Sequence, residues 1–422
     1  MSKKKKQAPP VAPITPSTPP SVPPAAPTPA PASRRDLAWF GGILLAALVL
    51  RLIYLGRADL WQDEMLLVMT ANINLGVGEV FRNYWASQMV SLGWMPLPAL
   101  VQNVFMSFVS AWIPDIMQNP FAARIPGVLL GVLGVAGVWK LAGRGYAPAV
   151  RTAATLVAAA TYYPVFYARE VHAYPLLLAL APWALYYFTA ALSGGVPRVL
   201  PKLFVFTLLL ANAHLTAPML VFAMAVVAGL CWLNRIKQGA SSPEAKRALG
   251  AVIAIALAGA AVIPVFMKIL GGDSPHLKQA SGVSPLFVLN DVVAKLFLGD
   301  WPVPAALGWL VVAAGAGMAI ARRRTAPEPA LHAALLGLGG GLILLAALRT
   351  QYLSARYFAV VTPILMLFIV LGLFAIADAV AAKILRKERL AIPIGWGLAG
   401  LFLAIHLILF LPPMYVLKNK ST

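Results

Sequence analysis

Long apolar segments, each with at most one charged side chain, fill this chain from Leu37 onward. A helix that crosses a bilayer needs about 20 mainly apolar residues, because its backbone polar groups must be satisfied within the segment. Hydropathy indicates about eleven such segments. They lie near 37–55, 119–139, 152–168, 174–191, 202–214, 216–233, 248–269, 304–321, 331–348, 357–381 and 391–411. A membrane β-barrel is excluded because its strands would alternate in polarity. A soluble enzyme is excluded because only 11% of the residues are charged. We therefore predict an all-α polytopic membrane protein.

Residues 1–35 differ sharply from the rest, because Pro and Ala dominate and basic residues stand at both ends. Such a composition cannot bury a core, so we expect a disordered cytoplasmic tail. The first apolar segment has no small-residue cleavage site, so it is expected to stay as an anchor. The lysine cluster is interpreted as a topology determinant, with binding of anionic lipid or a partner as the alternative.

Loop charges predict the orientation. If 96–113 lies flat on the outer surface, 22 of the 34 Lys and Arg residues fall on the inner side, as cytoplasmic loops require. If 96–113 crossed the membrane, every later loop would invert. We therefore predict a cytoplasmic N-terminus and an interfacial helix at 96–113. The first outer loop then covers 56–118, and residues 271–303 form a later outer loop with a lid-like role.

The outer loops carry most of the carboxylates, and the most informative are Asp63 and Glu64, just beyond the first apolar segment. An acidic pair at that depth is costly. One carboxylate can deprotonate an acceptor hydroxyl while its neighbour orients it or holds a cation. The alternative is that the pair only favours the dipole of a following helix.

Two further polar clusters are expected on the same side. One is the run from Arg169 through Glu170 and His172 to Tyr174, and the other contains Arg349 and Arg356. Arginine suits phosphate because its paired N–H donors match phosphate oxygens. Lipid headgroup contact is the alternative for these arginines. A lone histidine such as His214 is more often hydrogen-bonded structure than a ligand.

No metal or nucleotide motif is present: the sequence has no HExxH, no CxxC and no Walker A. We therefore expect that no cofactor is required. A divalent metal ion remains possible, and its oxygen ligands would be Asp63, Glu64 and Glu170.

These motifs, in their order, resemble the GT-C membrane glycosyltransferases. The similarity is greatest to the bacterial branch related to protein O-mannosyltransferases and to the transferase that adds aminoarabinose to lipid A. It covers about Leu37 to Leu371. The motifs are the segments 61–64 (WQDE), 95–98 (MPLP), 121–127 (FAARIPG), 167–174 (YAREVHAY), 213–215 (AHL) and 356–363 (RYFAVVTP). Met95 and His172 depart from the family pattern, because many members have a polar or basic residue at these places.

The resemblance implies a GT-C catalytic domain over 36–422 that moves a sugar from a polyprenyl-phosphate donor to a lipid, glycan or protein acceptor. Transfer would be inverting, on the periplasmic face of a bacterial inner membrane, and no nucleic acid is expected as a partner. The implied catalytic residues are Asp63 and Glu64. Donor phosphate binding is assigned to Arg356, Arg349, Arg169 and Arg124. The sugar or acceptor pocket is assigned to Glu170, His172, Tyr174, Trp61 and His214.

Three other functions fit parts of the pattern. A ligase or polymerase of lipid-linked glycans would share the location and the carrier lipid. A lipid or solute transporter would suit the intramembrane charge, although we find no internal repeat and the charged groups lie at the interface. A membrane scaffold that recruits partners through the proline-rich tail would not need the acidic pair.

Overall fold

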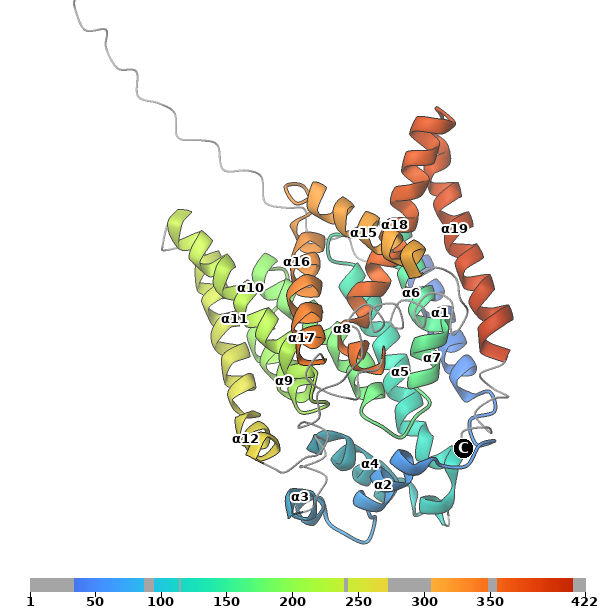
Figure 1. Ribbon diagram of the computed structural model, residues 1–422, viewed down its shortest axis with the longest axis vertical. Helices are drawn as coiled ribbons and strands as arrows, with labels where there is room; N and C mark the ends of the chain where they lie inside the picture. The colour runs from blue at the N-terminus through green and yellow to red at the C-terminus, as the bar shows by residue number, and fades with distance from the viewer. Residues whose placement is uncertain are drawn as a thin grey trace, which may run out of the picture.

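The computed structural model describes residues 34–86, 95–113, 115–238, 242–271, 305–347 and 355–412, and these residues form helices and connecting loops without strands (Figure 1). The first half contains α1 (Arg34–Leu52), α2 (Gln62–Thr70), α3 (Val77–Ala86), α4 (Pro96–Val109), α5 (Pro120–Ala142), α6 (Pro148–Ala160), α7 (Tyr162–Tyr167), α8 (Tyr174–Ser193) and α9 (Val199–Ala211). The second half contains α10 (Ala217–Gln238), α11 (Pro243–Ala260), α12 (Ile263–Gly271), α15 (Ala305–Ala321), α16 (Pro327–Leu335), α17 (Gly341–Ala347), α18 (Thr362–Ala379) and α19 (Ala391–Ile405).

The predicted all-α polytopic architecture is confirmed. Within the described residues, seven helical segments are long and apolar enough to cross a membrane: 120–142, 174–193, 217–237, 243–265, 327–346, 362–384 and 388–409. Each of the predicted apolar segments coincides with helix, including the shorter α9 and α15. Many helices begin at a proline, which costs nothing in the first turn because its missing N–H has no partner there. The tail up to residue 33 and the lid-like segment 272–303 lie outside the described residues.

The loops predicted to lie inside meet at one end of the bundle. Arg144, which follows α5, donates to the Gly194 carbonyl after α8 at 2.6 Å. Arg235 at the end of α10 donates to the Leu192 carbonyl at 2.7 Å. Two arginines therefore bind carbonyl groups at the C-terminal end of α8, where the helix dipole favours positive charge.

The described part of residues 56–118, which we predict to be the first outer loop, forms a cap at the opposite end. Helices α2, α3 and α4 lie together beyond the ends of the long helices (Figure 1). Loops that follow α7 and α9 reach the same end, where the Leu97 N–H donates to the Asn212 carbonyl at 3.3 Å. The described loops thus alternate between two ends, as the charge pattern predicted, and 96–113 is not part of the bundle.

Glycines allow the long helices to pack closely. A Cβ on Gly127 of α5 would lie 2.7 Å from the Ala168 carbonyl oxygen, and one on Gly134 would meet the Leu178 carbonyl of α8. The same packing joins α15 to α18, where Gly315 faces the Phe368 carbonyl and Gly372 faces that of Val311. Small residues let membrane helices approach closely enough for van der Waals packing to hold them together.

The predicted segment 152–168 is a broken helix. Residue Thr161 is extended (φ −82°, ψ 155°) and separates α6 from α7. Arg51 of α1 donates to the freed carbonyls of Ala158 and Ala159 at 3.0 and 2.8 Å. His406, after α19, accepts the Tyr162 N–H at 3.1 Å through Nδ1. The backbone groups that lose their helical hydrogen-bond partners at the break are therefore paired by the side chains of Arg51 and His406.

Two glycines in α15 provide a matched test of this packing. We expect Gly315→Ala to cost about 1–3 kcal/mol, because the added methyl overlaps α18. Gly317→Ala should cause no loss, because nothing lies within 4 Å of its Cβ position and alanine is the better helix former. Thermal unfolding of both variants in detergent measures the difference. Equal melting temperatures would contradict the close contact between α15 and α18.

Candidate functional site

The first turn of α2 places its two carboxylates in different surroundings. Glu64 is fully buried, whereas Asp63 is partly exposed. The Arg124 guanidinium of α5 donates to both Glu64 oxygens, at 2.6 Å from Nη2 and 3.0 Å from Nε. Glu64 also accepts the Val171 N–H at 3.0 Å and the Trp61 N–H at 3.3 Å. Its oxygens are therefore engaged in holding the fold, and Asp63 is the carboxylate turned towards solvent.

Arg124 is committed to the same structural task. Besides Glu64, it donates to the carbonyls of Leu55, Ala58 and Asp59 at 3.0, 2.7 and 2.9 Å. A guanidinium has five N–H donors, and these contacts use all of them. Its side chain is only 2% exposed. The predicted phosphate-binding role of Arg124 therefore does not fit the geometry.

Arg169 is also buried, and it holds the connection that leaves α1. Its Nη2 donates to the Ile53 carbonyl at 2.8 Å. The next residue, Tyr54, has a left-handed backbone (φ 52°), which is strained for a bulky side chain. Arg169 and Arg124 fix the carbonyls on either side of Tyr54, at Ile53 and Leu55. Arg169 therefore has a structural contact through Nη2, and its role in phosphate binding stays a prediction.

Asp63 and Arg356 influence each other across the site. Burial raises the pKa of Asp63, the Arg356 guanidinium opposes this increase, and the nearby charge of Glu64 adds to it. Among the described residues, no ion pair holds either side chain. A carboxylate with a raised pKa is a stronger base than an ordinary aspartate. The arrangement therefore pairs a basic carboxylate with a cation suited to an anionic group.

A row of rings connects Asp63's helix to Arg356. The Trp61 ring, at the start of α2, lies 6.5 Å from His172, and His172 stacks on Tyr174 at 4.4 Å with an interplanar angle of 9°. Tyr174 is 5.6 Å from His214, and His214 is 5.6 Å from Tyr357. We call Trp61, His172, Tyr174, His214 and Tyr357 the ring row. It brings four residues of the predicted sugar or acceptor pocket together.

Arg356 stands beside the far end of the ring row. Its guanidinium carbon lies 6.0 Å from the centre of the Tyr174 ring and 5.7 Å from that of Tyr357. The Tyr163 hydroxyl donates to the backbone carbonyl of Arg356 at 3.5 Å and thereby helps to hold the Arg356 backbone in place. Sequence reasoning missed Tyr357 and Tyr163 as site residues, because aromatic residues at the ends of membrane helices are usually interfacial anchors.

The two histidines of the row are neutral at physiological pH. Burial lowers the pKa of His172 well below its usual value, and repulsion from His214 when that ring is protonated and from the Arg356 guanidinium lowers it further. Burial, together with Arg356, lowers the pKa of His214 to about 3. His214 Nδ1 is within hydrogen-bonding distance of the Thr216 hydroxyl, at 2.9 Å, and accepts the Thr216 N–H at 3.2 Å. This bonding agrees with the expectation of a structurally held histidine, although the ring also belongs to the row.

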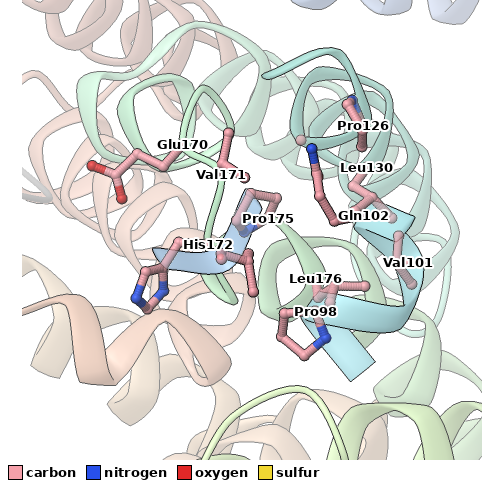
Figure 2. Close-up of a pocket in the computed structure, with 12 residues that line it drawn as sticks. Pro98, Val101, Gln102, Pro126, Leu130, Glu170, Val171, His172, Pro175 and Leu176 are labelled. Carbon is pink, nitrogen blue, oxygen red and sulfur yellow. The ribbon is translucent and has the colours of Figure 1, made fainter. Parts of the chain in front are cut away.

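A small pocket lies next to the loop between α7 and α8, and helices α4, α5 and the start of α8 also line it. Most of its lining is apolar, and the polar members are Gln102, Glu170 and His172. Figure 2 shows the Glu170 carboxylate and the His172 ring extending to one side of the loop, away from Pro126 and Leu130. Glu170 is 5% exposed. The pocket is therefore lined mainly by apolar residues, and the Glu170 carboxylate lies at one side of it.

The residues do not assemble the suggested metal site. Glu64 directs its oxygens to Arg124, so it does not converge with Asp63 and Glu170 on a common point. Within the described part of the chain, no group of three or more His, Cys, Asp or Glu side chains has a geometry suited to a metal ion. Arg349, the other predicted phosphate ligand, lies outside the described residues.

Comparison with solved structures identifies the fold. The chain is similar to ArnT from Cupriavidus metallidurans in the apo state, with a TM-score of 0.52, 14% identity, and 90% of this chain and 78% of that chain covered. It is similar to the same protein bound to undecaprenyl phosphate, with a TM-score of 0.52, 15% identity and the same coverage. The chain has the GT-C fold. No protein-family model and no curated protein matches the sequence.

The buried ion pair makes a prediction about stability. We expect Arg124→Met to cost about 3–5 kcal/mol, because it leaves the Glu64 carboxylate buried without its cation. The exposed neighbour Arg57 offers a control, and Arg57→Met should change stability by less than about 0.5 kcal/mol.

The double variant Glu64→Gln with Arg124→Met should recover part of the loss, because no charge is then left unpaired. Thermal unfolding in detergent measures both single variants, Arg124→Met and Glu64→Gln, together with the double variant and the Arg57→Met control. A double variant that is destabilised by the sum of the two single changes would show that the ion pair is not the coupling interaction.

Proposed function

We propose that the protein is a glycosyltransferase that moves a sugar from a polyprenyl-phosphate-linked donor to a hydroxyl of a lipid, glycan or protein acceptor. The observation that supports this most is the electrostatic pairing of a basic carboxylate, Asp63, with a cation, Arg356, which stands beside the Tyr174 and Tyr357 rings of the ring row. The GT-C fold adds support, because a structural neighbour, ArnT, has been captured with undecaprenyl phosphate.

In the proposed reaction, the Asp63 carboxylate takes the proton of the acceptor hydroxyl. The acceptor oxygen then attacks the anomeric carbon from the face opposite the phosphate, and the bond between that carbon and the phosphate oxygen breaks. The electron pair leaves with the polyprenyl phosphate, whose growing charge Arg356 stabilises. A single displacement of this kind inverts the anomeric centre.

The ring row is proposed to form the wall against which the sugar lies. Aromatic rings give apolar contact area, and the neutral His172 and His214 add hydrogen-bonding groups without charge. Glu170 is proposed to complete the sugar or acceptor pocket from the loop after α7. Glu64 is assigned a different role from the predicted helper in catalysis: it positions α2 and thereby the base.

The reaction is proposed to occur on the outer, periplasmic face of a bacterial inner membrane. The described loops rich in Lys and Arg gather at the end of the bundle opposite to the cap, and cytoplasmic loops are typically basic. The N-terminus would then be cytoplasmic. A carrier lipid explains how an activated sugar reaches a site that faces away from the cytoplasm.

Asp63→Asn tests the base. We expect transfer to fall by about 10²–10⁴-fold, because the amide cannot accept the proton, with no loss of thermal stability. Purified protein is incubated with radiolabelled polyprenyl-phosphate sugars and membrane extract, and label is followed into lipid, glycan and protein fractions. Asp59→Asn, at an exposed position nearby, is the control. Near wild-type transfer by the Asp63 variant would remove it as the base.

Arg356→Gln tests the cation in two ways. Loss of charged hydrogen bonds to phosphate should raise the KM for the donor by about 10–100-fold, equivalent to about 1.5–3 kcal/mol. Asp63 works as a base only when deprotonated, so transfer is lost as the pH falls through its pKa. Because Arg356 opposes the raised pKa of Asp63, the variant should lose activity at a higher pH than the wild type. An unchanged acid limb would show that the two side chains are not coupled.

A further inference from the structure

Helix α7 does not take its direction from α6, although a single residue joins the two helices. The backbone of that residue, Thr161, is extended, and it ends the hydrogen-bond ladder of α6. Helix α7 has only six residues, and a helix this short does not hold itself together in isolation. Its direction must therefore be set by the elements that pack against it.

One face of α7 belongs to the candidate site. Tyr163 and Tyr167 are four residues apart, which places them on the same face, and their ring centres lie 4.5 Å apart. Tyr167 meets Tyr174 of the ring row edge to face at 5.1 Å. The Tyr163 hydroxyl donates to the Arg356 carbonyl. The direction of α7 therefore decides how Tyr174 and Arg356 are supported.

A different face of α7 lies against residues 406–411, which follow α19 and which we call the α19 end. Figure 1 shows α7 next to this end of α19, on the side towards the cap. The Tyr162 N–H donates to His406 Nδ1, and Val165 shares a buried apolar cluster with Leu411. Residues 407–409 are exposed, whereas His406 is fully buried. The α19 end thus offers α7 one polar and one apolar contact.

A widened helical turn brings His406 and Leu411 to the same side. The Leu411 N–H donates to the His406 carbonyl, five residues earlier in the chain. In a regular α-helix, side chains five residues apart point about 140° away from each other. A turn closed by such an i→i+5 bond places them one above the other, and turns of this kind are frequent at functional sites. The turn therefore lets both side chains reach α7.

We infer that the α19 end is a positioning element of the site: His406 and Leu411 fix the direction of α7, and α7 in turn holds Arg356 and Tyr174 in place. The inference rests on the proposed role of Arg356 in binding the donor phosphate. The motifs of the family resemblance end before α19 begins. The resemblance therefore gives no role to His406.

Variants of His406 test the inference in the full chain, purified in detergent. His406→Leu removes the acceptor of the Tyr162 N–H, whereas His406→Asn keeps one, because the amide oxygen can take the place of Nδ1. His332→Leu is the matched control. His332 is also fully buried, and its two ring nitrogens each lie 2.9 Å from a hydroxyl oxygen, of Tyr146 and of Thr189. Tyr146 belongs to the loop after α5, at the end of the bundle opposite to the cap.

Binding of undecaprenyl phosphate, added alone, is measured through the rise of the unfolding temperature with lipid concentration. We expect His406→Leu to bind about 10-fold more weakly than the wild type, equivalent to one charged hydrogen bond, and His406→Asn and His332→Leu to bind within about twofold of it. Wild-type affinity in His406→Leu would overturn the inference. An equal loss of affinity in His332→Leu would also overturn it, because weak binding would then be a general result of destabilisation.

Hydrogen exchange without lipid separates this result from the proposed function. Exchange in both 162–167 and 355–361 should be faster in His406→Leu than in the wild type, because α7 and the Arg356 backbone lose a shared support. His332→Leu should leave both segments unchanged. Unchanged exchange of 355–361 in His406→Leu would overturn the inference, whatever the lipid result. If the wild type does not respond to undecaprenyl phosphate, the proposed function fails, and the exchange result alone decides the positioning role.

Discussion

The buried ion pair between Glu64 and Arg124 is the interaction on which the candidate site depends. Arg124 reaches from α5 to three carbonyls of the connection after α1, and Glu64 reaches from α2 to the Val171 N–H of the loop after α7. Two charges in such a place require full pairing, because desolvation is otherwise too costly. The pair thereby fixes α5, the cap and the loop of His172 relative to one another, and Asp63 takes its place as the residue next to Glu64.

Four arginines in and around the candidate site divide into two groups once their contacts are known. Arg51, Arg124 and Arg169 are buried and donate to backbone carbonyls at helix ends and around the strained Tyr54. Each satisfies groups that have no water to bind, which is a structural need. Arg356 differs, because it is partly exposed beside Tyr174 and Tyr357. Of these four described arginines, Arg356 is thus the one best suited to bind an anion.

Sequence patterns predicted the all-α membrane fold and its alternating loops because hydrophobicity and charge act on whole segments and leave a strong signal. The order of the motifs, through the family resemblance, also led us to predict that Asp63, His172, Tyr174 and His214 belong to one site. The resemblance ranked Asp63 before Glu64 as the base and Arg356 before Arg124 as the phosphate ligand. The sequence itself offered no physical reason for this order, because adjacent or identical residue types differ only in their three-dimensional partners. The break at Thr161 was missed as well, since its partners, Arg51 and His406, are more than 100 residues away in the chain.

The charge arrangement of the site follows from these partners. Glu64 and Arg124 neutralise each other, and burial keeps His172 and His214 uncharged. Asp63 and Arg356, in contrast, are both partly exposed, and the charge of Arg356 lowers the pKa of Asp63 against the effect of burial. Partial burial weakens the solvent screening of the interaction between these two charges. Protonation of Asp63 would therefore change the electrostatic potential at Arg356. Deprotonation of the acceptor hydroxyl and departure of the phosphate would then be electrostatically coupled within one site.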